Sequence, residues 1–221
     1  MPTPDQFYTA SARKLQAENQ TLKLADAVVH AIVSDELKPE QIGFIGSLDY
    51  FFLSTINEEN EPTVSYKGGP VGLAHVVSPR KIVFPNYDGN GMFLSMGNVQ
   101  ATSNVGLLFI DFVTPLRVRV QGEAKLTKNP EYLEQFPGST MIVEINITSV
   151  FYNCARYIHK HTRVETSKYV PDNKGNQPFP AWKRIDALQE VLHPTDIGRA
   201  AEEGGTITEA EYGAAVASGT S

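Results

Sequence analysis

One segment of the sequence, residues 85–91, combines residue types that can hold an anion through the backbone. It consists of Pro85-Asn86-Tyr87-Asp88-Gly89-Asn90-Gly91. Because Gly and Asn tolerate positive φ angles, successive N–H groups in such a turn can point the same way and surround a phosphate. The segment follows an apolar stretch, residues 81–84, and precedes a short helical stretch, residues 92–98. The pattern favours a phosphate-bearing ligand, with an ordinary surface turn between two strands as the alternative.

A second candidate for anion binding is the stretch Ser65-Tyr66-Lys67-Gly68-Gly69, at the end of an expected strand. A lysine beside two glycines can present its ammonium group and accessible backbone amides to a phosphate. The phosphate loop of nucleotide hydrolases has a different spacing, because there the lysine follows a longer glycine-bounded loop. We therefore do not expect nucleotide hydrolysis, and a solvated lysine next to a turn is the alternative.

Two arginines, Arg117 and Arg119, project from one face of a third stretch. Residues 116–122 alternate strictly between apolar and polar side chains, as in a strand with one buried face. In a ligand groove the two guanidinium groups could bind a dianion through paired hydrogen bonds. On the outside of a barrel they would be ordinary solvated charges, and the pattern alone does not choose between the two faces.

The segment 153–161 contains the single cysteine, Cys154, with His159 and His161 close by. Two histidines at a spacing of two would need further ligands to hold a metal, and no carboxylate is in register. Nothing in the sequence indicates that the thiol has a lowered pKa. We predict no metal site and assign no catalytic residue, and the chain has neither a Gly-x-Ser-x-Gly nor a His-Glu-x-x-His motif.

Extended stretches between residues 50 and 152 must position these groups. They are rich in aromatic and β-branched residues and are separated by turn residues, at close to the roughly 8–12 residue spacing of a barrel or sandwich. The stretches are residues 50–56, 63–66, 74–77, 81–84, 105–111, 116–122 and 141–147. We predict that about six or seven strands close a small barrel.

Helices are expected before and after this strand-rich region. Apolar residues share one face over residues 22–33, and a shorter helix is expected from Pro39 to Ile45. After Arg163 the sequence is polar with scattered prolines, and a helix is expected over residues 181–192. The small, polar end, residues 200–221, is expected to be mobile or held by a partner chain.

The composition limits the class of protein. The chain has 221 residues, of which 41% are hydrophobic and 20% are charged, as in a soluble globular protein. A net charge of −6 disfavours nucleic-acid binding. The single cysteine cannot form an intramolecular disulfide, and neither a secretory signal nor an apolar run of roughly 20 residues is present. We expect a cytoplasmic protein without a membrane segment.

Several of these segments together resemble the pyridoxamine 5′-phosphate oxidase-like family of flavin-binding split barrels. The resemblance covers roughly residues 40–160 and includes the hairpin of residues 51–67 and the strands of residues 105–111 and 116–122. It is strongest in Phe84 to Asn98 and in Asn153 to His159, which resemble a flavoprotein branch of the family more than the true oxidase.

The resemblance implies a mainly β fold with flanking helices, in the form of a six-stranded antiparallel split β-barrel. It implies a homodimer with flavin mononucleotide (FMN) in each of two grooves between the subunits. We expect an N-terminal helical segment packing on the barrel, residues 1–46, a split-barrel FMN-binding domain, residues 47–162, and a C-terminal extension, residues 163–221.

The resemblance also implies which side chains contact the cofactor. Arg117 falls where the oxidase has a flavin-contacting Gln, and the segment from Cys154 to His161 could reach the flavin from the partner chain. The oxidase holds the phosphate with Arg and Lys at a helix start that here follows Asp88, so the phosphate is assigned to helical N–H groups, Lys67 and Arg117 or Arg119. The expected cofactor contacts are Ser65, Tyr66, Lys67, Pro85, Asn86, Asn90, Asn98, Arg117, Arg119 and Arg156.

The leading functional hypothesis is an FMN-dependent oxidoreductase acting on an unknown small molecule. In such a protein the cofactor performs the redox chemistry while the protein fixes its ring and controls access to it. One alternative is a flavin- or phosphate-ligand-binding protein without enzymatic activity, which is consistent with the shortage of catalytic side chains. Another is a split barrel that holds haem in the same groove.

Overall fold

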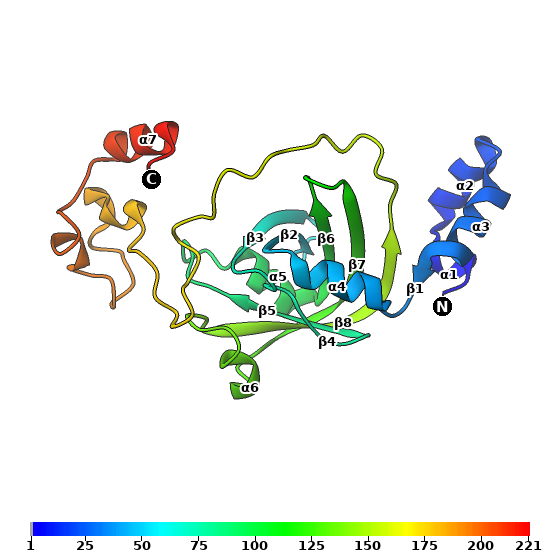
Figure 1. Ribbon diagram of the computed structural model, residues 1–221, viewed down its shortest axis with the longest axis horizontal. Coiled ribbons are helices and arrows are strands. Elements are labelled where there is room, and N and C mark those ends of the chain that lie inside the picture. Colours follow the sequence, from blue (N-terminus) through cyan, green and yellow to red (C-terminus); the bar gives the residue numbers. More distant parts are fainter. Residues whose placement is uncertain (1) are drawn as a thin grey trace. The chain divides into compact units, whose positions relative to one another are not determined.

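The computed structural model describes residues 2–221, which form two compact units (Figure 1). The first unit takes in the chain up to Thr166 together with Val170–Gly175, and the second contains Ser167–Tyr169 and Asn176–Ser221. Among the described residues, no helix is both long and apolar enough to cross a membrane. The two units are described separately below.

A single antiparallel sheet forms the body of the first unit. Its strands follow the spatial order β3-β2-β6-β7-β8-β5-β4, and the short strand β1 pairs with β8. The strands are β1 (Val33–Ser34), β2 (Tyr50–Ile56), β3 (Pro62–Gly68), β4 (His75–Ser78), β5 (Lys81–Asn86), β6 (Asn104–Asp111), β7 (Leu116–Thr127) and β8 (Met141–Tyr152).

The predicted split β-barrel is confirmed, but the expected number of six strands is too low. The sheet described here has eight strands. The strand missed by the sequence analysis, β1, has only two residues and directly follows a helix, so it has no periodicity to detect.

The sheet curls because alternate side chains of its strands meet in one core. In β2, Phe51, Leu53 and Thr55 are buried, whereas the residues between them are partly exposed. The ring of Phe51 lies 5.0 Å from that of Phe84 on β5, although β2 and β5 do not pair. Side-chain packing therefore brings together β2 and β5, which the hydrogen-bonded order of the sheet separates by β6, β7 and β8. We call the core-facing surface of the sheet its inner face.

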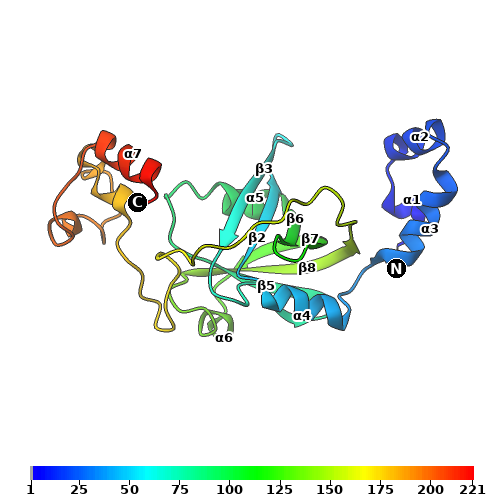
Figure 2. The same ribbon diagram turned by 45° about the horizontal axis from the view of Figure 1, so that its top comes forward.

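Helices flank the sheet at several points (Figures 1 and 2). The predicted helix over residues 22–33 is present as α3, and the one from Pro39 as α4. The helices of the first unit are α1 (Pro4–Phe7), α2 (Ala10–Glu18), α3 (Leu22–Ile32), α4 (Pro39–Ser47), α5 (Leu94–Thr102) and α6 (Pro130–Leu133).

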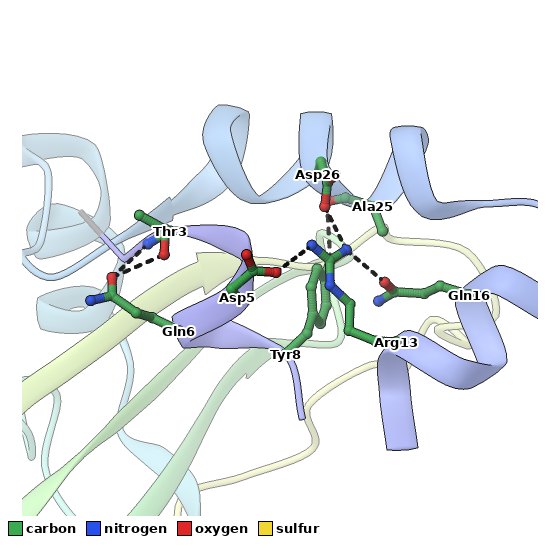
Figure 3. A network of polar contacts seen from close by, with 8 residues as sticks. All are labelled: Thr3, Asp5, Gln6, Tyr8, Arg13, Gln16, Ala25 and Asp26. Carbon is green, nitrogen blue, oxygen red and sulfur yellow. Dashed lines mark hydrogen bonds and ion pairs between the residues drawn. The ribbon is translucent and has the colours of Figure 1, made fainter. Parts of the chain in front are cut away.

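Arg13 holds the three N-terminal helices together (Figure 3). Its guanidinium group donates to Asp26 at 2.6 Å, to Asp5 at 2.9 Å and to Gln16 at 3.1 Å. The same group lies 5.4 Å from the centre of the Tyr8 ring. These contacts are polar and mostly exposed, so they order the helices without adding a large apolar core.

The second unit contains three short 3₁₀ helices and one α-helix. They are η1 (Ala181–Arg184), η2 (Asp186–Leu188), η3 (Arg199–Ala201) and α7 (Glu209–Ser218). The predicted continuous helix over residues 181–192 is wrong, because Ile185 forms a β-bridge with Ile207 and interrupts it. The helix α7 was missed, although Thr208 and Glu211 form a capping box at its start.

Candidate functional site

A row of polar side chains lies on the inner face of β3. Ser65 pairs with Leu53 and Lys67 pairs with Phe51, and both partners are buried in the core. Directly paired residues of antiparallel strands project to the same face, so Ser65 and Lys67 also face inward. β3 is an edge strand, which leaves this row accessible from the side.

Helix α5 lies across this row. The hydroxyl groups of Ser65 and Ser95 are 3.1 Å apart, in the first turn of the helix. One turn further along, Asn98 donates from Nδ2 to the hydroxyl groups of Thr55 at 3.0 Å and Thr63 at 3.3 Å. Since the row runs Thr63, Ser65, Lys67, the lysine lies at the end of the row nearest the helix N-terminus.

Lys67 brings a positive charge to this helix end. Its side chain is partly buried, and this burial lowers the pKa of the ammonium group. Within residues 2–221 it has neither a carboxylate nor another charged partner. The helix adds positive potential, because its first backbone N–H groups have no intrahelical acceptor and its N-cap residue, Phe93, provides no side-chain cap. The arrangement is suited to an anion.

Tyr87 connects the predicted anion turn to the end of β3. A Cβ atom on Gly69 would lie 2.6 Å from Cδ1 of Leu73 and 3.3 Å from Cε2 of Tyr87, so glycine at this position lets the chain pass close to both side chains. Burial raises the pKa of the Tyr87 hydroxyl group. The structure thus brings together two segments about twenty residues apart. We call Ser65, Lys67, Tyr87 and Ser95 the inner cluster.

The other residues predicted on and around the turn have distinct environments. Pro85 is buried and Asn86 ends β5 opposite Met141. Asn90 is exposed, and its Oδ1 atom accepts from the backbone N–H of Met92 at 3.1 Å. Asn98 is buried and its amide ties α5 to the sheet. The turn predicted over residues 85–91 therefore begins only after Asn86, because Pro85 and Asn86 extend β5, and within the loop the side chain of Asn90 bonds to the backbone.

Arg117 and Arg119 lie on the opposite face of the sheet, which we call the outer face. Val118 and Val120, which alternate with the arginines along β7, are fully buried. Because successive side chains of a strand point to opposite faces, the arginines point away from the core. The Nη2 atom of Arg117 donates to the carbonyl oxygen of Cys154 at 2.8 Å. Arg119 is exposed and pairs with Leu108 and Phe151.

The segment that follows β8, residues 153–156, lies beside Arg117 and adds further polar side chains to this face of the sheet. The backbone N–H of Arg156 donates to the thiol of Cys154 at 3.4 Å. This bond lowers the pKa of the thiol, with further contributions from the side chain of Arg156 and the charge of Arg117. The sequence analysis missed this shift because it depends on the fold of the segment. We call Arg117, Arg119, Asn153, Cys154 and Arg156 the outer cluster.

Tyr66, the remaining predicted contact, also lies on the outer face. Its ring stacks on Tyr50 with 5.6 Å between centroids, and Tyr50 in turn stacks on Phe112 at 6.3 Å. Phe112 stacks on His161 at 4.8 Å. The row of rings ends at Tyr66, which is 62% exposed and so offers aromatic surface to a flat ligand. No group of three potential metal ligands occurs in residues 2–221.

The sequence and the fold were compared with known proteins. Residues 37–154 match the family model described as pyridoxamine 5′-phosphate oxidase. No curated protein matches the sequence.

Solved structures with a similar fold come from several proteins. HupZ of Group A Streptococcus is 10% identical over 57% of this chain and 99% of its own, with a TM-score of 0.45. An FMN-binding protein from Syntrophomonas wolfei subsp. wolfei is 14% identical over 65% of this chain and 95% of its own, with a TM-score of 0.40. An F420 reductase is 15% identical over 52% of this chain and 98% of its own, with a TM-score of 0.40.

Proposed function

The chain belongs to the pyridoxamine 5′-phosphate oxidase family, and on this premise we propose that it binds FMN and acts as an FMN-dependent oxidoreductase on a small molecule. The inner cluster supports the proposal on physical grounds, because it is suited to the phosphate group of such a cofactor. The outer cluster and Tyr66 are suited to its ring.

The observation that carries the proposal is the position of Lys67. A partly buried ammonium group without a counterion lies on the inner face of β3, one inward-facing position beyond Ser65, whose hydroxyl group contacts Ser95 in the first turn of α5. The start of that helix also carries partial positive charge. This combination is unfavourable until an anion binds, and a phosphate dianion satisfies both charges. The hydroxyl groups of Ser65 and Ser95 can donate to the same phosphate.

We propose that a complete site needs two subunits. The inner and outer clusters lie on opposite faces of the sheet, and β2 and β6 separate β3 from β7. A single cofactor reaches both clusters when the second comes from another copy of the chain. A homodimer with the cofactor between subunits follows from this, and it requires the outer face to be covered by the partner.

FMN, when bound, supplies the electron-transfer chemistry. The residues of the chain hold its phosphate, orient its ring and limit the access of water. Lys67 and the first N–H groups of α5 anchor the phosphate, while Arg119, Arg156 and Tyr66 line the ring side. Pro85, Asn86, Asn90 and Asn98 shape the loop and helix between these groups. We assign no general acid or base.

The absorbance spectrum of the purified protein tests the proposal directly. We expect a yellow protein that releases FMN on denaturation and elutes as a dimer in size-exclusion chromatography. A colourless protein that FMN does not reconstitute would contradict flavin binding, and a haem spectrum would favour the haem alternative. Anaerobic bleaching by NADH or NADPH, with turnover, would distinguish an enzyme from a flavin-binding protein.

A further inference from the structure

A long loop leaves the end of β8 (yellow in Figure 1). Residues 155–166 of this loop belong to the first unit and contain no helix or strand, and all of them are exposed except the partly buried Ile158. Tyr157 and Val164 are 92% and 94% exposed, so these large side chains do not pack on the sheet. A segment that buries so little surface separates readily from the rest of a fold. We call residues 155–166 the strap.

His161 and Arg163 hold the strap against one end of the sheet. The imidazole ring of His161 stacks on the ring of Phe112 with 4.8 Å between centroids, and its backbone N–H donates to the carbonyl oxygen of Phe112 at 3.1 Å. The Nη2 atom of Arg163 lies 2.6 Å from Oδ2 of Asp49. Phe112 directly follows β6 and Asp49 directly precedes β2, its antiparallel neighbour. The strap therefore passes from the end of one strand to the start of the next.

These contacts place the strap along the row of stacked rings that ends at Tyr66. His161 caps the row at Phe112. Arg163 lies near the other end, because burial raises the pKa of the Tyr66 hydroxyl group and the nearby charge of Arg163 opposes this shift. Tyr50 and Phe112 are only partly exposed, whereas Tyr66 is largely exposed. The strap thus covers the row at the Phe112 end and leaves the ring of Tyr66 open.

The chain is fixed on both sides of the strap. Before it, the carbonyl oxygen of Cys154 accepts from Nη2 of Arg117 at 2.8 Å. After it, Pro171 is buried, and Gly175 packs so closely on Gly138 that a Cβ atom on Gly175 would lie 2.5 Å from the backbone nitrogen of Gly138. A loop with fixed ends and an exposed middle can lift without leaving the fold, as the loops that cover binding sites do.

The contacts under the strap are of a kind that opens readily. Half of the Arg163 side chain is exposed, so its ion pair with Asp49 is partly solvated. Such a pair gains little over two separately hydrated charges. His161 is also exposed, and its ring therefore exchanges contact with Phe112 for contact with water when the strap lifts.

We propose that the strap is a gate on the outer face, closed while Arg163 binds Asp49 and His161 stacks on Phe112, and lifted when a flat ligand enters or leaves the aromatic row. The inference rests on the proposed FMN function, with the flavin as the ligand whose exchange is controlled. The strap opens and closes in both the free and the occupied protein. It therefore changes the rates of binding and release by the same factor and leaves their ratio, the affinity, unchanged.

Limited proteolysis of the ligand-free protein with trypsin measures the opening of the strap. The cleavage sites in the strap are Arg156, Lys160 and Arg163. Cleavage tracks the population of the open form, because a bound segment does not fit the protease. If the strap lifts as one piece, Asp49→Asn accelerates cleavage after the distant Arg156, and His161→Ala accelerates cleavage after Arg163. We expect about a fivefold increase or more in each case, read by mass spectrometry.

The control of access is tested by stopped-flow fluorescence of FMN binding and release. In Asp49→Asn and in His161→Ala we expect both rate constants to rise by about threefold or more, with the dissociation constant unchanged within about twofold. Asp35→Asn, which removes an ion pair with Arg80 on another part of the chain, is the matched control and should keep the wild-type cleavage and rates. Circular dichroism verifies that each variant is folded.

Separate outcomes overturn the two proposals. A wild-type protein that does not bind FMN overturns the FMN function and with it this inference. A protein that binds FMN, with wild-type cleavage and wild-type rates in both variants, overturns the inference alone. Faster cleavage with unchanged rates also overturns it, because the strap then opens without controlling access. A weaker affinity that arises from faster release alone would make the strap residues ligand contacts and not a gate.

Discussion

The inner and outer clusters both contain positive charge, but the charged residues and their surroundings differ. The inner cluster has one cation, Lys67, at the end of a helix whose other polar residues, Asn98 among them, are satisfied by the sheet. The outer cluster has several arginines on an open face, with two buried polar atoms left unsatisfied. The polar groups of the inner cluster are thus tied to the sheet of the same chain, whereas two atoms of the outer cluster have no hydrogen-bond partner within residues 2–221.

The inner cluster should depend most strongly on its single cation. We expect Lys67→Ala to weaken FMN binding by about 1.5–3 kcal/mol, the value of a hydrogen bond to a charged group. Fluorescence titration measures the loss. Lys125→Ala, which removes an exposed lysine bound to Glu144 on another part of the sheet, should leave the affinity unchanged. Equal affinity in Lys67→Ala and the wild type would place the phosphate elsewhere.

The attachment of α5 to the sheet should contribute to stability. Asn98→Ala removes the donor to Thr55 and Thr63, and Thr55 is almost fully buried. We expect the free energy of unfolding to fall by about 1–3 kcal/mol, since two hydrogen bonds are lost and Thr55 keeps only the hydroxyl group of Thr63, 2.9 Å away, as a partner. Urea denaturation gives the value. A control substitution of exposed Asn146 by Ala should have a small effect, and a similar loss in both variants would argue against a specific role for Asn98.

The affinity for FMN should depend on pH through Lys67. The protonated ammonium group binds phosphate, and burial lowers the pKa of this group in the free protein. Affinity should therefore fall as the pH rises, and the fall should begin below the pKa of about 10.4 of an ordinary lysine. Arg stays protonated throughout, so Lys67→Arg should abolish the dependence. The same pH profile in both proteins would exclude Lys67 as the titrating group.

The smallest expected effect concerns the thiol of the outer cluster. Because the pKa of Cys154 is lowered, its thiolate form and its reaction with iodoacetamide should extend to lower pH than for an ordinary cysteine. Arg156→Ala should raise the pH of half-maximal labelling only partly, since the main cause is a backbone hydrogen bond that alanine retains. A labelling profile of an unperturbed thiol in the wild type would contradict the described loop conformation.

Local patterns in the sequence were sufficient to predict much of the secondary structure of this protein. Alternation in residues 116–122 predicted a strand with Arg117 and Arg119 on one face, and the helical periodicity of residues 22–33 predicted α3. These features depend on neighbours within a few residues, so a sequence displays them directly. The wrong prediction over residues 181–192 arose where a contact between distant residues, Ile185 and Ile207, overrides the local preference.

The sequence by itself determined seven of the eight strands and the resemblance of its segments to a flavin-binding family. The turn predicted over residues 85–91 begins later, because Pro85 and Asn86 extend β5. Only the tertiary structure decided that Lys67 faces inward on β3 and that Arg117 faces outward on β7. The physical reason is that facing and burial depend on pairing register and on packing between distant segments. A one-residue change of register would reverse both faces without altering the pattern along the chain.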